Sequence, residues 1–563
     1  MIFGRVKSLD AILATAEKKS LHRSLGAFQL TMLGIGCVIG TGIFVLTSAA
    51  AQKAGPGMIL SFVVAGAVCV VAALCYAEIA AMAPVAGSAY TYTYSVMGEL
   101  LAWTVGWALI LEYAVAASAV SVGWSGYFAG SILHETFGIT LPTWLSHGPY
   151  MPGGFINLPA VVISLLITWL LMIGTTESAR VNAVLVTIKV VALTAFVALT
   201  LPKTHGANFE PFLPTGILGS NGLGVVGAAA TIFFAYVGFD AVSTAAEETK
   251  DPQRNVPIGL IASLGICTVF YMLVAAGAIG TIGGQPLFGA DGVPFTTGSA
   301  ELARACLIPA NAQALVCSNE ALAHVLRQVG YANVGNWMGY AAGLALPSVI
   351  LILMFGQTRI FFVMSRDGLL PEVLSRVHPK WKTPHIVTAI TGVFVAFAAA
   401  FLPVGQLADI ANAGTLYAFM MVAIALLILR KREPNRHRPF RTPAAWIVAP
   451  LTIVGCIGLY FSLPYEAMAV LPIWGAVGLV IYFLYGYRKS YLGRGMADGG
   501  EPIDMAPRAA TETGRKKGRG GNPAAFFVPG SKGVIPAEAG VHFLQRLRVY
   551  RAAGQYGFPP PRE

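Results

Sequence analysis

Apolar stretches of membrane-spanning length alternate with short polar segments along most of the chain. We count twelve such stretches, and a run of about twenty apolar residues is long enough to cross a bilayer as a helix. They lie near residues 28–51, 58–82, 97–128, 156–174, 181–201, 223–245, 257–282, 337–365, 385–402, 408–429, 446–463 and 470–487. The pattern therefore predicts an all-α integral membrane protein with twelve transmembrane helices.

The first apolar run contains four glycines where a membrane helix should be most regular. They are Gly34, Gly36, Gly40 and Gly42, and each costs a helix about 1 kcal/mol relative to alanine. Lipid-facing backbone cannot leave its polar groups unpaired, so an unwound turn here must face protein or water. Such a turn frees amide groups that can hold a substrate carboxylate. The alternative interpretation is close helix packing through Gly36 and Gly40.

The sixth apolar run contains a second interruption, with Gly238 and Asp240 near its centre. The first interruption opens a block of five predicted helices, and the second opens the next five. Interrupted helices at corresponding positions of two halves are typical of transporters built from inverted repeats. From position alone, we expect a ten-helix core at 28–430, with repeats at about 28–201 and 223–430, followed by two accessory helices at 446–487.

Three ionisable residues lie deep within apolar runs. Glu112 shares a helical face with small residues, which predicts that it points into the helix bundle. Its alternative role is that of a structural hydrogen-bond acceptor. Lys189 lies well inside its run, so we favour a functional role over a side chain that extends to the membrane interface. Asp240 lies at the second interruption.

Charge is sparse and concentrated in a few segments. Charged residues make up 11% of the chain and apolar residues 56%, against about 25% charged for a soluble domain. The net charge of +11 gathers in the polar segment 1–27, in 366–382 and in 430–441, which fall on one side of a twelve-helix protein. The opposite loops carry few cations, among them Lys53 and Lys203. This asymmetry predicts cytoplasmic termini in the plasma membrane and argues against nucleic-acid binding.

Two further features concern the cysteines and the C-terminal region. Cys306 and Cys317 fall in the long external loop and can pair if this loop faces an oxidising compartment. Residues 498–563 are rich in Gly, Pro and Arg without a helical period. We therefore expect a disordered cytoplasmic tail, and the alternative is a tail that binds a partner.

Four motifs, in order and on the expected helices, resemble the amino acid–polyamine–organocation superfamily, and within it the cationic amino acid transporter family. They are the stretches 36–44, 84–90, 238–249 and 356–371. The resemblance covers residues 20–490 or so and leaves out the tail. It implies a leucine-transporter-type fold with interrupted helices 1 and 6, and an amino acid carrier that works by alternating access.

The resemblance also implies a substrate site at the two interruptions. The substrate carboxylate would meet the amides of Thr41 and Gly42, and the α-ammonium would meet carbonyls of both interruptions. The expected binding residues are Val38, Ile39, Gly40, Thr41, Gly42, Phe234, Ala235, Val237, Gly238 and Phe239. The apolar stretch 341–349 argues against strict specificity for arginine or lysine.

Lys189 falls where proton-coupled relatives place a lysine in the space that a sodium ion occupies in sodium-coupled ones. The resemblance therefore implies H⁺ as the driving ion, with Glu112 and Asp240 as further titrating groups. We predict a proton-coupled amino acid symporter, an importer, in contact with membrane lipid; its oligomeric state and preferred amino acid stay open. The alternatives are an amino acid exchanger without proton coupling and an amino acid-sensing transceptor. We expect neither an enzyme nor a bound metal or cofactor, because no catalytic motif stands in a suitable context.

Overall fold

The computed structural model describes residues 5–6, 25–83, 87–174, 179–219, 221–240, 242, 249–381 and 383–495. All of them belong to one structural unit, Met1–Ile503. The expectations for most of the segment 1–27, for residues 84–86 of the second motif, for Glu247 and Glu248, and for the tail at 498–563 lie outside these residues.

The described residues form helices joined by turns and loops, and none of them belongs to a β-strand. Seven helical segments of this part of the chain are long and apolar enough to cross a membrane: Leu46–Met82, Glu99–Phe137, Ala183–Lys203, Pro252–Ile282, Ala332–Arg366, Val404–Arg432 and Tyr465–Lys489. Five shorter apolar helices accompany them: Ala27–Val38, Leu158–Ile173, Gly224–Tyr236, His385–Phe401 and Ala445–Phe461. Ten of the predicted apolar runs coincide with one of these helices, or with part of one, to within two residues. The first run, 28–51, instead spans Ala27–Val38, Thr41–Phe44 and the start of Leu46–Met82, and the sixth, 223–245, extends past Gly224–Tyr236.

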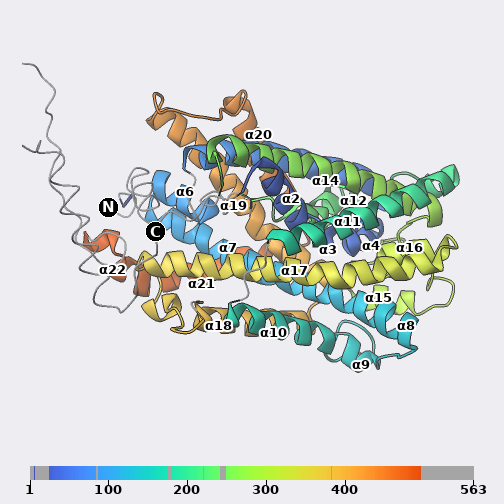
Figure 1. Ribbon diagram of the computed structural model, residues 1–563. Helices are drawn as coiled ribbons and strands as arrows, with labels where there is room; N and C mark the ends of the chain where they lie inside the picture. The colour runs from blue at the N-terminus through green and yellow to red at the C-terminus, as the bar shows by residue number, and fades with distance from the viewer. Residues whose placement is uncertain are drawn as a thin grey trace, which may run out of the picture. The chain divides into compact units, whose positions relative to one another are not determined.

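The helices form two groups that meet along the middle of the unit (Figure 1). In the first group, α14 (Pro252–Ile282) packs against α2 (Ala27–Val38) and α5 (Met58–Met82). In the second group, α7 (Glu99–Tyr127) packs against α17 (Ala332–Arg366). The remaining helices are α3 (Thr41–Phe44), α4 (Leu46–Ala54), α6 (Ser88–Val96), α8 (Glu135–Phe137), α9 (Thr143–Ser146), α10 (Leu158–Ile173), α11 (Ala179–Thr200), α12 (Gly224–Ile232), α15 (Ala300–Cys306), α16 (Ala321–Gln328), α18 (His385–Phe401), α19 (Val404–Arg432), α20 (Ala445–Phe461), α21 (Tyr465–Ile481) and α22 (Tyr487–Lys489).

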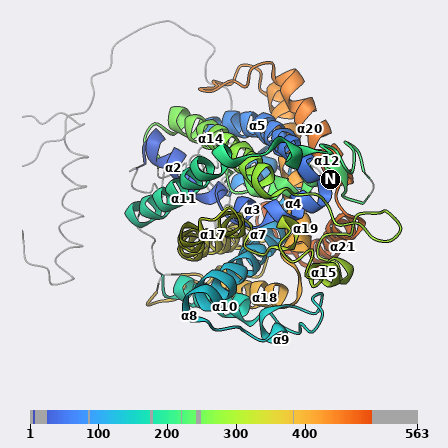
Figure 2. The ribbon, with the colours of Figure 1, turned by 90° about the vertical axis from the view of Figure 1, so that its right-hand side faces the viewer.

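The four-residue helix α3 lies in the interior of this arrangement. All four of its residues are buried, and Figure 2, which looks along the helices, shows α3 between α14 and α7. Helix α19 packs against α7 on one side and against α20 on another. Any site formed at α3 is therefore enclosed by helices from both groups.

Tryptophan contacts attach the accessory helix α21 to α7. The indole of Trp107 donates a hydrogen bond to the carbonyl of Trp474 at 2.8 Å, and the indole of Trp474 donates to the carbonyl of Trp107 at 2.7 Å. The two rings stack with their centroids 4.7 Å apart. These paired contacts place α21 against the second group of helices.

The long loop between α14 and α17 carries a disulfide. Cys306 and Cys317 are joined, with their Cα atoms 5.5 Å apart, so the pairing considered from the sequence is present. In the same loop, α16 buries most of its apolar residues and packs against α17. Arg327 at its end binds Glu320 and also donates to Ser131, which follows α7. The loop is thus packed onto the second group of helices.

Candidate substrate and proton sites

The first predicted interruption is present between α2 and α3. Helix α2 ends at Val38, and Gly40 has φ −144° and ψ −147°, which is outside the helical region. The next hydrogen-bonded turn begins only with the amide of Phe44, which donates to the carbonyl of Gly40. Within the described residues, no backbone carbonyl accepts from the amides of Thr41, Gly42 or Ile43. The interruption therefore leaves three consecutive amides available in a buried position.

The second interruption follows α12. The chain tightens into a 3₁₀ turn, η5 (Phe233–Tyr236), and then extends at Val237. Gly238 has a φ of +108°, a backbone conformation that side chains with a Cβ rarely adopt. This glycine follows the end of the helical turn, and Asp240, two residues later, accepts a hydrogen bond from Tyr113 of α7.

The two interruptions touch each other. A Cβ atom placed on Gly42 would lie 2.2 Å from the Cα of Ala235, which is closer than any real contact. A Cβ on Gly238 would lie 3.1 Å from the Cβ of Cys37. The glycines are therefore required for close approach of the two broken helices, and the expected binding residues of both interruptions come together at one place.

Helices α7 and α17 close the space beside the first interruption. A Cβ on Gly123 of α7 would lie 2.6 Å from the Cγ2 atom of Thr41, and a Cβ on Gly40 would lie 3.4 Å from a methyl group of Val349 on α17. The hydroxyl of Thr41 is buried without a hydrogen-bond partner in the described part of the chain. The surroundings of this backbone are thus apolar on the α17 side and polar at Thr41.

Tyr271 of α14 joins the two interruptions, and the sequence analysis missed it. Its hydroxyl lies 2.8 Å from the carbonyl oxygen of Val38 and 2.9 Å from that of Ala235. These are two of the carbonyls that we expected to bind the substrate ammonium. In this structure the tyrosine hydroxyl is the donor that they share. A tyrosine within an apolar run was the available signal, but a single sequence gives no means of telling which helix it faces.

Lys189 lies inside the bundle. Its side chain is 1% exposed, and its ammonium donates to the carbonyl of Gly36 at 2.9 Å. The contact joins α11 to the segment of α2 that precedes the first interruption. A lysine that extended along the helix to the membrane interface would leave its ammonium exposed, so this arrangement supports the interpretation of a buried, interacting group.

Glu112 and Asp240 are both fully buried near the second interruption. Tyr113 donates a hydrogen bond to the Oδ2 atom of Asp240 at 2.8 Å. Neither carboxylate oxygen of Glu112 has a hydrogen-bond partner in the part of the chain that the structure describes. Glu112 faces α19, because a Cβ atom placed on Gly414 of that helix would lie 3.2 Å from the Cβ atom of Glu112. It points into the bundle, as the face of small residues predicted.

A buried ion pair between α4 and α19 was also missed. We had assigned Lys53 to an external loop, but this assignment was wrong: Lys53 belongs to α4 and is 2% exposed. Its ammonium lies 3.0 Å from Oδ2 of Asp409 on α19 and also donates to the hydroxyl of Thr231 on α12. The pair therefore connects α4, α12 and α19.

The segment before α2 is also connected to the segment after the second interruption. Leu25, just before α2, forms an isolated bridge with Thr249, and the amide of Lys250 donates to the carbonyl of Leu25 at 2.8 Å. Residue 249 follows the second interruption in the chain. The two interrupted segments are thus paired at this end and in close contact at their centre.

Comparison with known proteins identifies the family of the chain. The family model described as amino acid permease matches residues 25–486, a range that contains both interruptions and every expected site residue. The chain belongs to the amino acid permease family. Its several apolar helices accordingly form a multi-pass membrane protein, and the resemblance to the amino acid–polyamine–organocation superfamily is confirmed.

Relatives in the permease family carry several substrate names. The chain is 42% identical to the branched-chain amino acid permease BcaP of Bacillus subtilis (strain 168), an alignment that covers 87% of this chain and 99% of the relative. It is 41% identical, over the same shares of the two chains, to the methylthioribose transporter of that organism. The chloroplastic cationic amino acid transporter 9 of Arabidopsis thaliana is 33% identical, over 86% of this chain and 81% of the relative. These relatives are permeases and transporters, not enzymes.

Proposed function

We propose that this permease carries a neutral aliphatic amino acid into the cell together with H⁺, by alternating access. The observation that carries the proposal is the contact between the two interrupted helices at Gly42 and Ala235. It brings three unpaired amides, suited to a carboxylate, next to the carbonyls of Val38 and Ala235, suited to an ammonium. Both charged groups of an α-amino acid would thus find partners where the two interrupted helices meet.

The preference for an aliphatic side chain rests on two observations. The methyl groups of Val349 lie closest to the backbone of Gly40 on the α17 side, where a cationic side chain would need an acidic or polar partner. The relative named for branched-chain amino acids is 42% identical over nearly its whole length, whereas the cationic transporter of Arabidopsis is 33% identical. We therefore favour leucine, isoleucine or valine as substrates.

The proposal also includes the membrane arrangement. It takes the coincidence of twelve apolar runs with helical segments as twelve membrane crossings, with two inverted five-helix repeats and two accessory helices. Both chain termini would face the cytoplasm, because the basic segments gather on that side. The membrane would be the plasma membrane.

Proton coupling would use buried ionisable side chains on α11, on α7 and at the second interruption. Lys189 binds the carbonyl of Gly36 just before the first interruption, so loss of its proton would weaken the contact between α11 and α2. Glu112 and Asp240 are fully buried acids close to the second interruption, and Asp240 is held by Tyr113 of α7. A proton can bias the conformation only if its affinity differs between the two states.

A second candidate substrate is methylthioribose. A relative of 41% identity bears this name, and it aligns over 99% of its length. This neutral sugar has neither a carboxylate nor an ammonium, so it would use the same pocket without the charge complementarity described above. Competition experiments distinguish the two candidates directly.

The test is uptake by the purified protein in proteoliposomes. Labelled leucine is offered from an acidic exterior to a neutral interior, and the control vesicles have no pH gradient. We expect accumulation only with the gradient, with inhibition by excess isoleucine and little inhibition by lysine or methylthioribose. Inhibition of leucine uptake by methylthioribose alone would indicate that the sugar, and not an amino acid, is the substrate. Exchange of leucine across the vesicle membrane that does not respond to the pH gradient would support the exchanger mechanism and contradict symport.

A further inference from the structure

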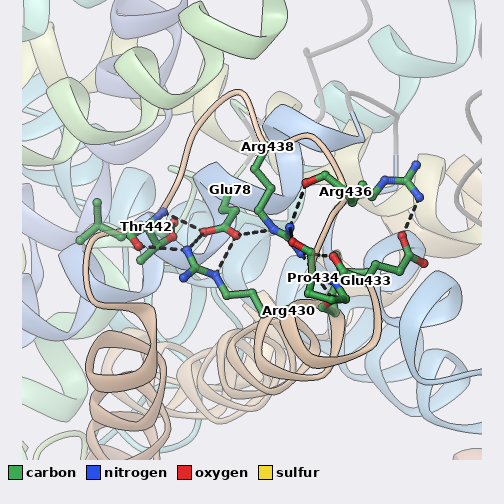
Figure 3. A network of polar contacts seen from close by, with 9 residues as sticks. Glu78, Arg430, Glu433, Pro434, Arg436, Arg438 and Thr442 are labelled. Carbon is green, nitrogen blue, oxygen red and sulfur yellow. Dashed lines mark hydrogen bonds and ion pairs between the residues drawn. The ribbon is translucent and has the colours of Figure 1, made fainter.

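Away from the substrate site, a buried glutamate organises the connection between α19 and α20. Glu78, near the end of α5, is fully buried. Its carboxylate accepts hydrogen bonds from the guanidinium of Arg430 and, at 2.8 Å, from the backbone amide of Thr442. The Nε atom of Arg438 lies 3.1 Å from its other oxygen. Figure 3 shows these contacts converging from α5, from the end of α19 and from the connecting segment.

The network separates the basic residues of this segment into two classes. Arg430 and Arg438 share the charge of Glu78, and Arg436 pairs with Glu433 at 2.7 Å. Lys431, Arg432 and Arg441 remain, and all three are exposed. In the part of the chain that the structure describes, no carboxylate forms an ion pair with any of these three. Half of the basic residues between 430 and 441 are therefore left available to an external anion.

Glu78 also brings the three available cations together. Its Oε2 atom binds Arg430 and the amide of Thr442, and Arg430 in turn donates to the carbonyl of Thr442 at 3.0 Å. Lys431 follows Arg430 directly and Arg441 precedes Thr442 directly, so their backbones start on either side of one hydrogen-bonded junction. The hydroxyl of Thr442 is also fixed, by the carbonyl of Leu74 at 2.8 Å. The cluster is thus built on a rigid base.

Apolar side chains next to this junction are exposed in a way that suits a membrane interface. Trp446 is 75% exposed and Ile447 is 49% exposed, at the start of α20. Exposed residues continue along α20 at Leu451 and Val454, as expected of a surface that faces lipid tails. Tryptophan favours the boundary between lipid head groups and tails. The three cations therefore stand at the level of the head groups.

We propose that Lys431, Arg432 and Arg441, together with Trp446, form a binding site for the head groups of anionic phospholipids. Cations beside a membrane helix attract acidic lipids, and fixing them around one buried carboxylate lowers the entropy lost on binding. Glu78 acts as the positioning residue, because its contacts with Arg430 and Thr442 set the spacing of the available cations.

The experiment counts bound lipids on the full-length detergent-solubilised protein by native mass spectrometry. The protein is titrated with phosphatidylglycerol, with phosphatidylcholine, or with inorganic phosphate. We expect tighter binding of phosphatidylglycerol than of phosphatidylcholine. The triple variant K431Q/R432Q/R441Q should lower the affinity for phosphatidylglycerol about fivefold or more. The control variant K203Q/R304Q/K380Q removes the same number of exposed cations elsewhere and should retain it.

Two further arms make the result decisive. E78Q keeps the three cations but weakens the contacts with Arg430 and Thr442 that set their spacing. It should lower phosphatidylglycerol affinity by a smaller factor than the triple variant. If E78Q does not fold, the two triple variants still decide. Equal losses in the two triple variants would overturn the proposal, because the effect would then be one of net charge. Displacement of phosphatidylglycerol by millimolar inorganic phosphate would show a free-phosphate site and would overturn it as well.

Discussion

At the scale of single residues, Gly42 is the position with the least freedom. A Cβ there would lie 2.2 Å from the Cα of Ala235 and 2.9 Å from its amide nitrogen. These are backbone atoms, which cannot rotate away as a side chain can. We expect Gly42→Leu to separate the two interrupted helices and reduce leucine binding by at least about tenfold, measured by scintillation proximity on purified protein.

The matched control for this variant is Gly458→Leu. Apart from its chain neighbours and the adjacent backbone of α20, no atom of the described residues lies within 4 Å of the position that a Cβ would take on Gly458. This variant adds the same side chain to a membrane helix and should bind leucine like the parent protein. If Gly42→Leu binds leucine with unchanged affinity, the substrate does not use the first interruption.

Lys189 offers a separate test of coupling. The ammonium donates to the carbonyl of Gly36 at 2.9 Å, in a position with 1% exposure. Lys189→Ala removes this donor, and Lys189→Arg introduces a guanidinium that does not release its proton at physiological pH. Both variants should lose accumulation driven by a pH gradient in proteoliposomes, even where exchange of labelled leucine for unlabelled leucine survives.

Lys203→Ala serves as the control, because Lys203 is an exposed cation just beyond the end of α11. It should accumulate leucine with the parental dependence on external pH. An unchanged pH dependence in Lys189→Ala would instead assign the coupling proton to Glu112 or Asp240.

At the scale of secondary structure elements, the ion pair between Lys53 and Asp409 connects three helices. Removal of one member of a buried pair leaves a charge without compensation, which typically costs about 3–5 kcal/mol. Lys53→Met and Asp409→Leu should each lower the thermal unfolding midpoint of the detergent-solubilised protein. The double variant should recover most of the loss, because apolar residues of similar volume can replace a buried pair. A double variant that is as unstable as the sum of the single changes would show that the ion pair does not link α4 to α19.

The sequence predicted those elements whose signal is local. Gly34 to Gly42 mark the first interruption within a few residues, where Gly42 permits the close approach of Ala235, and Gly238 marks the second, where φ is +108°. The burial of Glu112 followed from one helical face. Tyr271 and Asp409 were missed for a different reason: their partners, Val38 and Lys53, are over two hundred residues away in the chain. No single sequence states which helices face each other, so contacts of this kind require the structure.

At the scale of the whole molecule, the chain beyond Gly495 should be dispensable for transport. The family model ends at residue 486, and from the composition of 498–563 we expect a segment without a packed core. We expect a protein truncated after Gly495 to show the same initial rate of leucine uptake as the full chain. Loss of uptake in a truncated protein that keeps its unfolding midpoint would favour the transceptor alternative.

The bridge between Leu25 and Thr249 has a mechanical consequence. It pairs the two interrupted segments at one end, while Gly42 and Ala235 hold them together at the centre. Two helices that are joined at two points cannot easily move independently, so the interrupted helices should move as one rigid body. Motion during transport would then occur at the surface between these two helices and α7 with α17, and it would leave the contact between the interrupted helices intact.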